Sequence, residues 1–87
     1  GFSQKISAWL HDFGTSGQVH KEDLEKYLEL TDIKNLKEHF AQGKKSISIP
    51  YRRKDGNTYR STIMEMIKAK DYSDQNQSLY LYVKIAD

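Results

Sequence analysis

Histidines, serines and acids occur throughout this chain, but their spacing matches no common catalytic or metal-binding motif. The three histidines, His11, His20 and His39, form no H-x-x-x-H pair, and none lies in a dense group of carboxylates. Zinc requires three or four converging ligands. The chain has no cysteine and no G-x-S-x-G elbow for a nucleophilic serine. The sequence therefore predicts no catalytic residues, no metal ligands and no cofactor, and we expect the protein not to be an enzyme.

A short basic cluster is the strongest sign of a charged ligand. Residues 52–54 read Arg-Arg-Lys, with Tyr51 and Tyr59 nearby, and aromatic residues beside arginines on a sheet can stack on bases. However, Asp55 follows directly, and the net charge of the whole chain is only +2. A small nucleic-acid-binding module that uses the basic hairpin 52–54 is therefore the alternative function, weighed against a solvated hairpin tip.

Two methionines and two tyrosines form the candidate pocket or partner surface. Met64 and Met66 share one face of a predicted strand, and Tyr80 and Tyr82 share one face of the next. Flexible methionines next to tyrosines can adapt their shape to a small ligand or a partner protein. The alternative is ordinary packing of these side chains under a helix.

Hydrophobic periodicity divides the chain into a helical part and a sheet part. Apolar residues at helical spacing predict two to three short helices within about residues 3–42. From residue 46 the period changes to two, which predicts a three-stranded antiparallel meander over about 46–86. The Asp-Gly pair at 55–56 marks a hairpin, and Pro50 places the first strand at an edge. We expect one α+β domain over residues 1–87.

Local signals also place the helix ends and the core. Asp23 is expected to reach back to a free backbone N–H in a capping box. Asp32 is expected to cap the following helix, and Gly43 to end it in the left-handed conformation. The apolar faces predict a core of Ile6, Trp9, Leu10, Leu24, Leu28, Leu36, Phe40, Ile47, Ile49, Ile63, Ile67, Leu81 and Val83.

The last predicted strand is apolar on both faces. Residues 79–85 alternate aliphatic side chains with Tyr80 and Tyr82, and Lys84 is their sole charge. Such a strand normally lies inside a sheet, whereas a simple meander leaves it at an edge with unpaired backbone groups. We therefore expect a homodimer through this strand, formed by symmetric antiparallel pairing, unless the N-terminal segment pairs there instead.

Three segments resemble parts of PAS-type sensory domains. V-H-K-E-D at 19–23 is similar to the V-H-P-x-D segment of that family, with lysine where proline is usual. Y-R-R-K-D-G-N-T-Y-R at 51–60 resembles its strand–hairpin–strand, and L-Y-L-Y-V-K-I-A-D at 79–87 resembles its final strand. The longer string A-K-D-Y-S-D-Q-N-Q-S-L-Y-L-Y-V-K at 69–84 resembles the PAS-like domains that precede GGDEF diguanylate cyclase domains in Firmicutes.

The resemblance implies the C-terminal part of a PAS fold, without the two strands that precede the helices in that family. It implies a non-catalytic sensory or interaction module of a bacterial multidomain signalling protein. Such a module relays the state of a ligand or partner to a downstream output domain, such as a diguanylate cyclase in cyclic-di-GMP signalling. No haem-binding histidine or flavin-reactive cysteine maps onto this chain, so the small ligand is unidentified. We expect a cytoplasmic location, because no apolar run approaches the roughly 20 residues that span a bilayer.

Overall fold

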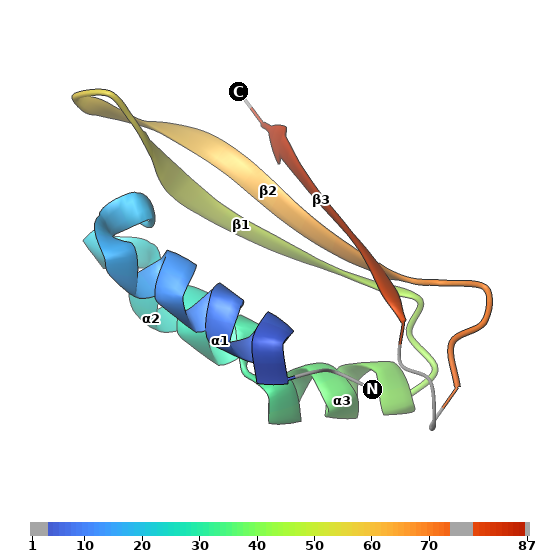
Figure 1. The fold of residues 1–87 in the computed structure, drawn as a ribbon. Coiled ribbons are helices and arrows are strands. Elements are labelled where there is room, and N and C mark those ends of the chain that lie inside the picture. Colours follow the sequence, from blue (N-terminus) through green and yellow to red (C-terminus); the bar gives the residue numbers. More distant parts are fainter. Residues whose placement is uncertain (1–3, 74–77, 87) are drawn as a thin grey trace.

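The computed structural model describes the backbone of residues 4–73 and 78–86, and within these ranges the side chains from residue 8 onward. The described residues form three α-helices and then a three-stranded antiparallel sheet, which confirms the predicted α+β class (Figure 1). None of the described helices is both long enough and apolar enough to cross a membrane. The elements, in chain order, are α1 (Gln4–Phe13), α2 (Lys21–Thr31), α3 (Ile33–Ala41), β1 (Ser46–Asp55), β2 (Thr58–Lys68) and β3 (Leu79–Ile85).

The helices form one layer, and the sheet, in the order β1-β2-β3, forms the other (Figure 1). After α1 the chain continues in a wider helical turn over Gly14–Gln18, in which Gly17 leaves the helical conformation with a φ of +91°. Gly14 is buried at the contact between this turn and α2, where a Cβ would collide with the ring of Tyr27. The Tyr27 hydroxyl donates a hydrogen bond to the carbonyl of Leu10 (2.8 Å), which ties α2 to α1.

The helix ends agree with most of the local signals. Asp32 caps α3, and Gly43 beyond it has a φ of +87°, as predicted. The capping box at Asp23 is wrong, because His20 caps α2 by accepting the N–H two residues further on (3.1 Å). The Asp23 carboxylate bonds to Arg52 of β1 instead. A residue read as a local cap therefore makes a tertiary contact.

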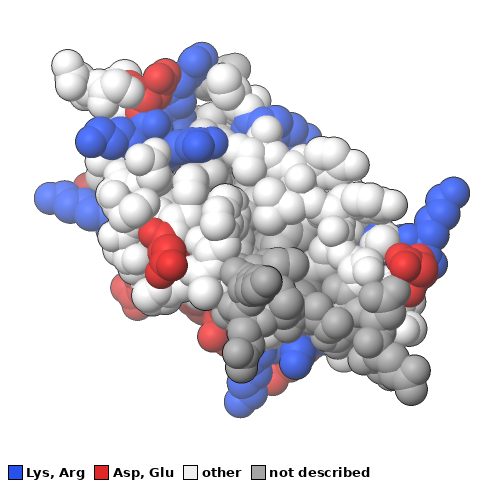
Figure 2. All heavy atoms as spheres, in the orientation of Figure 1, with Lys and Arg blue, Asp and Glu red and all other residues white. Residues whose placement is uncertain are grey.

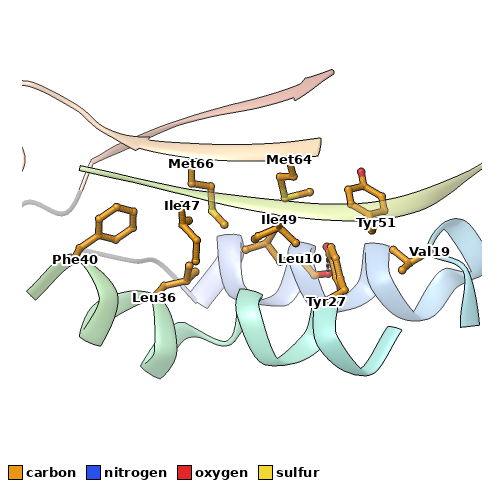
Figure 3. Close-up of a cluster of buried hydrophobic side chains, with 10 residues drawn as sticks. All are labelled: Leu10, Val19, Tyr27, Leu36, Phe40, Ile47, Ile49, Tyr51, Met64 and Met66. Carbon is orange, nitrogen blue, oxygen red and sulfur yellow. Dashed lines mark hydrogen bonds between the residues drawn. The ribbon is translucent and has the colours of Figure 1, made fainter. Parts of the chain in front are cut away.

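The core lies between the helix layer and the inner face of β1 and β2 (Figure 3). The predicted core is confirmed at Leu10, Leu36, Phe40, Ile47 and Ile49, and Leu24 and Leu28 pack against it while partly buried. The buried cluster consists of Leu10, Val19, Tyr27, Leu36, Phe40, Ile47, Ile49, Tyr51, Met64 and Met66. Ile6 lies outside the residues whose side chains are described.

The prediction for the buried face of β2 is wrong. Met64 and Met66 point into the core, whereas Ile63 and Ile67 lie on the outer face and are half-buried. Both faces of β2 carry apolar side chains, so alternation alone could not distinguish them. The pairing with β1 determines which face of β2 is buried, because Met64 lies opposite the buried Ile49.

Three other predicted core residues are exposed. Trp9 is 49% exposed and stacks on the ring of Phe13 (5.5 Å between centroids) rather than entering the core. Leu81 and Val83 are each 39% exposed. They point to the helix side of the sheet, but the core lies beneath β1 and β2, and of the β3 side chains only Leu79 packs against it.

Candidate functional site

Within the described part of the chain, β3 pairs with β2 along one edge and has no neighbour along the other. The Ala69 N–H donates to the Ser78 carbonyl (3.0 Å), and the Ala86 N–H donates to the Ser61 carbonyl (2.9 Å). Because bonding alternates along an antiparallel strand, even-numbered residues bond inward to β2 and odd-numbered residues point outward. The free edge is therefore formed by the backbone groups of Leu79, Leu81, Val83 and Ile85.

Both faces of β3 are apolar and accessible. On the helix side Ile85 is 56% exposed, and on the outer face Tyr80 and Tyr82 are each 54% exposed. The single charge of the strand is neutralised, because Lys84 Nζ lies 2.9 Å from a Glu65 carboxylate oxygen. An exposed edge strand whose single charge is paired within its own sheet has few of the devices that prevent pairing with another chain.

The predicted surface of Met64, Met66, Tyr80 and Tyr82 does not form. Met66 lies opposite Leu81 in the register, whereas Tyr82 lies opposite Glu65, so the methionines and tyrosines are on opposite faces of the sheet. The methionines are core residues under the helices, which is the alternative considered from the sequence. The two tyrosines remain exposed on the outer face. The sequence could not show this, because it does not indicate which face the helices cover.

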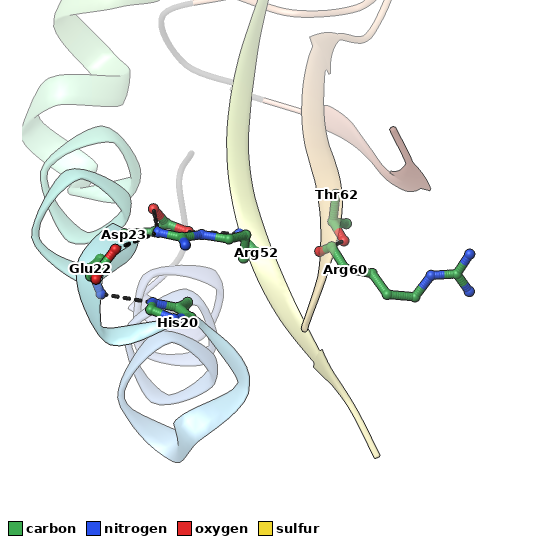
Figure 4. A network of polar contacts seen from close by, with 6 residues as sticks. All are labelled: His20, Glu22, Asp23, Arg52, Arg60 and Thr62. Carbon is green, nitrogen blue, oxygen red and sulfur yellow. Dashed lines mark hydrogen bonds and ion pairs between the residues drawn. The ribbon is translucent and has the colours of Figure 1, made fainter. Parts of the chain in front are cut away.

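Arg52, the first residue of the predicted basic cluster, is held by α2 (Figure 4). Asp23 accepts hydrogen bonds from the Arg52 backbone N–H (2.9 Å) and from Nε (2.9 Å) and Nη2 (3.0 Å) of its guanidinium. Glu22 accepts a further bond from Nη2 (3.1 Å), and the His20 N–H donates to the Arg52 carbonyl (2.9 Å).

The charges of this contact stabilise each other. The bonded Arg52 guanidinium lowers the pKa of Asp23 below its ordinary value, and the two carboxylates raise the pKa of Arg52 further. Arg52 is thus a structural residue that holds the start of α2 against β1. The hairpin 52–54 therefore does not present three free cations, which weakens the nucleic-acid alternative.

A separate group of charged residues lies at the hairpin end of the sheet. Arg53 of β1 and Arg60 of β2 are directly opposite each other in the register. The Arg53 guanidinium lies 5.1 Å above the ring of Phe13, and an Arg60 guanidinium nitrogen lies 3.6 Å from a carboxylate oxygen of Asp55. Arg60 extends away from the Asp23–Arg52 contact, as Figure 4 shows. Figure 2 shows Lys and Arg side chains gathered at this end of the molecule.

These residues border a hollow of about 360 Å³ between the hairpin and the end of β3. We call it the hairpin hollow; it is lined by Gln18, Arg53, Lys54, Asp55, Arg60, Thr62, Val83, Lys84 and Ile85. Arg60 and Ile85 were not among the site residues predicted from the sequence. A signal for Arg60 existed, because strand pairing across the short turn after Asp55 places it opposite Arg53. No local sequence pattern predicts that the end of β3, with Ile85, lies beside this hairpin.

Within the described ranges, no three His, Asp or Glu side chains come together as a metal site would require. Comparisons with protein-family models, with curated proteins and with solved structures found no match to this chain. The resemblance to PAS-type domains therefore rests on sequence segments alone.

Proposed function

We propose that this chain is a non-catalytic interaction and relay module that pairs with a second strand through β3. The observation that carries the proposal is the free edge of this seven-residue strand, which is apolar on both faces. Unpaired N–H and C=O groups in a row are a template for strand addition, in which backbone bonds supply affinity and alternate side chains supply specificity.

The proposed occupant of this edge is a second copy of the chain. A two-fold axis at Tyr82 places Leu81 opposite Val83 of the second copy, and both residues have outward backbone groups. The same register places Leu79 opposite Ile85, so aliphatic side chains meet on the helix side. Tyr80 then lies opposite Lys84 on the outer face, so no like charges meet across the new pairing. The strand is therefore complementary to itself over its whole length.

The relay role follows from the resemblance to PAS-type domains. Two of the three segments that carry this resemblance are in contact, since Asp23 of V-H-K-E-D binds Arg52 of Y-R-R-K-D-G. The third segment is β3 itself. In this proposal the chain belongs to a cytoplasmic bacterial signalling protein, and its last strand leads to an output domain such as a diguanylate cyclase. A change in the pairing of β3 would then shift the population of conformations that the output domain experiences.

The association is tested by light scattering over a concentration series. We expect dimers in the parent chain and at least about a tenfold weaker association in Val83→Pro. Proline removes an outward N–H and leaves the bonds between β3 and β2 intact, because residue 83 does not bond inward. Val83→Thr is the matched control, because it keeps the N–H and the β-branched shape, and it should still dimerise.

A second variant covers the case in which Val83→Pro does not fold. Leu81→Lys places a charge on the edge and should also weaken the dimer, with circular dichroism confirming the fold. A parent chain that remains monomeric at high concentration would contradict pairing between copies. If the Leu81 and Val83 amides of that monomer exchange slowly, another segment of the chain covers the edge.

A further inference from the structure

His20 lies where three elements meet. Its side chain caps α2, and its backbone N–H bonds to the Arg52 carbonyl of β1 (Figure 4). Its imidazole packs against the ring of Tyr59 in β2, with 4.7 Å between the ring centroids and 68° between the ring planes. The side chain is half-buried and borders a separate hollow of about 320 Å³, so water reaches it. A change in the charge of this ring therefore acts on the helix layer and on the sheet together.

The capping bond defines the protonation state of the imidazole. His20 Nδ1 lies 3.1 Å from the backbone nitrogen of Glu22. A backbone N–H can only donate, so Nδ1 is the acceptor and carries no proton. The ring is therefore neutral in this structure, with its single proton on Nε2.

Protonation of the imidazole would end this bond. An imidazolium has donors at both nitrogens and no acceptor, so the Glu22 N–H would lose its partner. The added positive charge would also lie at the positive end of the α2 dipole, where a cation is unfavourable. Histidine is the side chain that ordinarily changes its charge between about pH 5 and about pH 8. The cap of α2 thus depends on a group of the type that responds to mild acidification.

Two carboxylates on the first turn of α2 attract an imidazolium. The pKa of Asp23 is lowered mainly by its hydrogen bonds to Arg52 and, in smaller part, by the charge of His20. Glu22 and Asp23 both bind Arg52, whose guanidinium repels an imidazolium and competes with it for the same oxygens. When the ring gains a proton, it is therefore drawn from the cap toward these carboxylates.

The remaining charged groups around the ring are cations. Lys21 borders the same hollow, and Lys54 lies opposite Tyr59 in the register, so both disfavour a further positive charge here. The turn Gly14–Gln18, which also borders the hollow, has no ionisable side chain. Attraction and repulsion therefore act in opposite directions. Protonation changes the arrangement of the first turn of α2 more than the free energy of unfolding.

We propose that His20 is a proton-sensitive joint between α2 and the sheet. Neutral His20 caps α2 through Nδ1, whereas protonated His20 leaves the cap and turns to the carboxylates of Glu22 and Asp23. The first turn of α2 then holds Arg52 less tightly. This inference goes beyond the pairing of β3 and does not depend on it.

His39 is the matched control, because its bond survives protonation. His39 Nε2 donates to the Ser46 carbonyl (2.7 Å), and an imidazolium makes the same bond. His39 also lies in the last turn of α3, where the helix dipole favours a positive charge. A histidine at a helix end therefore acts as such a joint only where its ring nitrogen must accept.

The experiment is an NMR titration of the isotope-labelled chain between about pH 7.5 and about pH 5.5. At the upper pH the nitrogen shifts of the His20 ring should report a proton on Nε2 and none on Nδ1. On acidification the Glu22 amide should move with the same midpoint as the His20 ring. Asp23 stays ionised over this range, because its pKa lies below the ordinary value of 3.8.

Three variants assign the change to His20. His20→Asn keeps a capping acceptor that does not titrate, so its Glu22 amide should stay in place. At the lower pH the Arg52 Nε–H should exchange with water about threefold faster in the parent than in His20→Asn, and at the upper pH equally fast. His20→Ala should show the Glu22 amide near its acidic position throughout, and His39→Gln should titrate like the parent. Circular dichroism confirms the helix content of each variant.

Three results would overturn the proposal. A proton on Nδ1 at the upper pH would contradict the capping bond itself. A Glu22 amide that stays in place while the His20 ring gains its proton would show that the cap does not depend on charge. A Glu22 amide that moves equally in the parent and in His20→Asn would show that another group titrates. Because β3 pairing is measured separately by light scattering, these outcomes are distinguishable from a failure of the dimer.

Discussion

The sheet has two outer edges, one along β1 and one along β3, and the residues that line them differ. On β1 the outward positions are even-numbered, because the Lys45 carbonyl bonds inward to the Lys68 N–H. His39 Nε2 donates to the Ser46 carbonyl (2.7 Å), and Pro50 has no N–H to expose. Asp23 and His20 bind the outward groups of Arg52, as described above. Side chains and backbone from the helices therefore protect much of this edge.

The β3 edge has no such protection among the described residues. Its outward positions carry aliphatic side chains; Leu79 packs against the core, whereas Leu81, Val83 and Ile85 are exposed. The difference teaches that protection of an edge here is a property of the neighbouring helices and not of the strand sequence alone. The bare edge is the one that remains available for another strand.

The largest expected effect is a difference in stability loss between a substitution in the covered strand β1 and one in the exposed strand β3. Ile49→Ala should lower the free energy of unfolding by about 2–5 kcal/mol, because Ile49 is fully buried. Ile85→Ala removes the same atoms from a residue that is 56% exposed and should cost less than about 1 kcal/mol. Urea unfolding at low protein concentration measures both. Equal losses would mean that β3 is as well covered as β1.

The next largest effect on stability is expected from removing the contact between Asp23 and Arg52 that protects the β1 edge. Asp23→Ala removes the acceptor for the Arg52 backbone N–H and guanidinium, and should destabilise the chain by about 1–3 kcal/mol. Glu25→Ala, on the same helix but exposed and without a described partner, is the control and should change stability by less than about 0.5 kcal/mol. If Asp23→Ala also increases self-association while Val83→Pro is present, the β1 edge has become a second pairing site.

The same contact gives a pH dependence of defined sign. Arg52 holds the pKa of Asp23 below its ordinary value of 3.8 in the folded chain. The stabilisation is therefore fully present above the ordinary pKa and is lost as the pH falls through the lowered one. We expect the stability difference between the parent and Asp23→Asn to be constant near neutral pH and to shrink below about pH 4. A difference that grows on acidification would contradict the ion pair.

The smallest effect concerns Pro50. Pro50→Val restores one outward N–H on β1 and should change the free energy of unfolding by less than about 1 kcal/mol. Association measured by light scattering should stay as in the parent, because the helices still bind the neighbouring outward groups of β1. New dimers in Pro50→Val would show that proline, rather than the helices, protects this edge.

Much of the architecture could be predicted from local patterns. The change of period near residue 46, the turn after Asp55 and the position of Pro50 correctly indicated a sheet that begins at an edge. The caps at Asp32 and Gly43 were also correct, because both depend on a few neighbouring residues. The candidate surface of Met64, Met66, Tyr80 and Tyr82 was not predicted correctly. Its four residues had to be assigned to faces of the sheet, and that assignment depends on how the helices and strands pack.

The sequence by itself determined the order of the elements, the ends of most helices and the unusual character of β3, which is apolar on both faces. These follow from periodicity and turn chemistry, which act over a few residues. Only the tertiary structure decided that Met64 rather than Ile63 is buried and that Asp23 binds Arg52 across 29 residues. It also decided that Arg53, Arg60 and Ile85 border one hollow. The reason is that a strand with two apolar faces contains no local information about which one the helices cover.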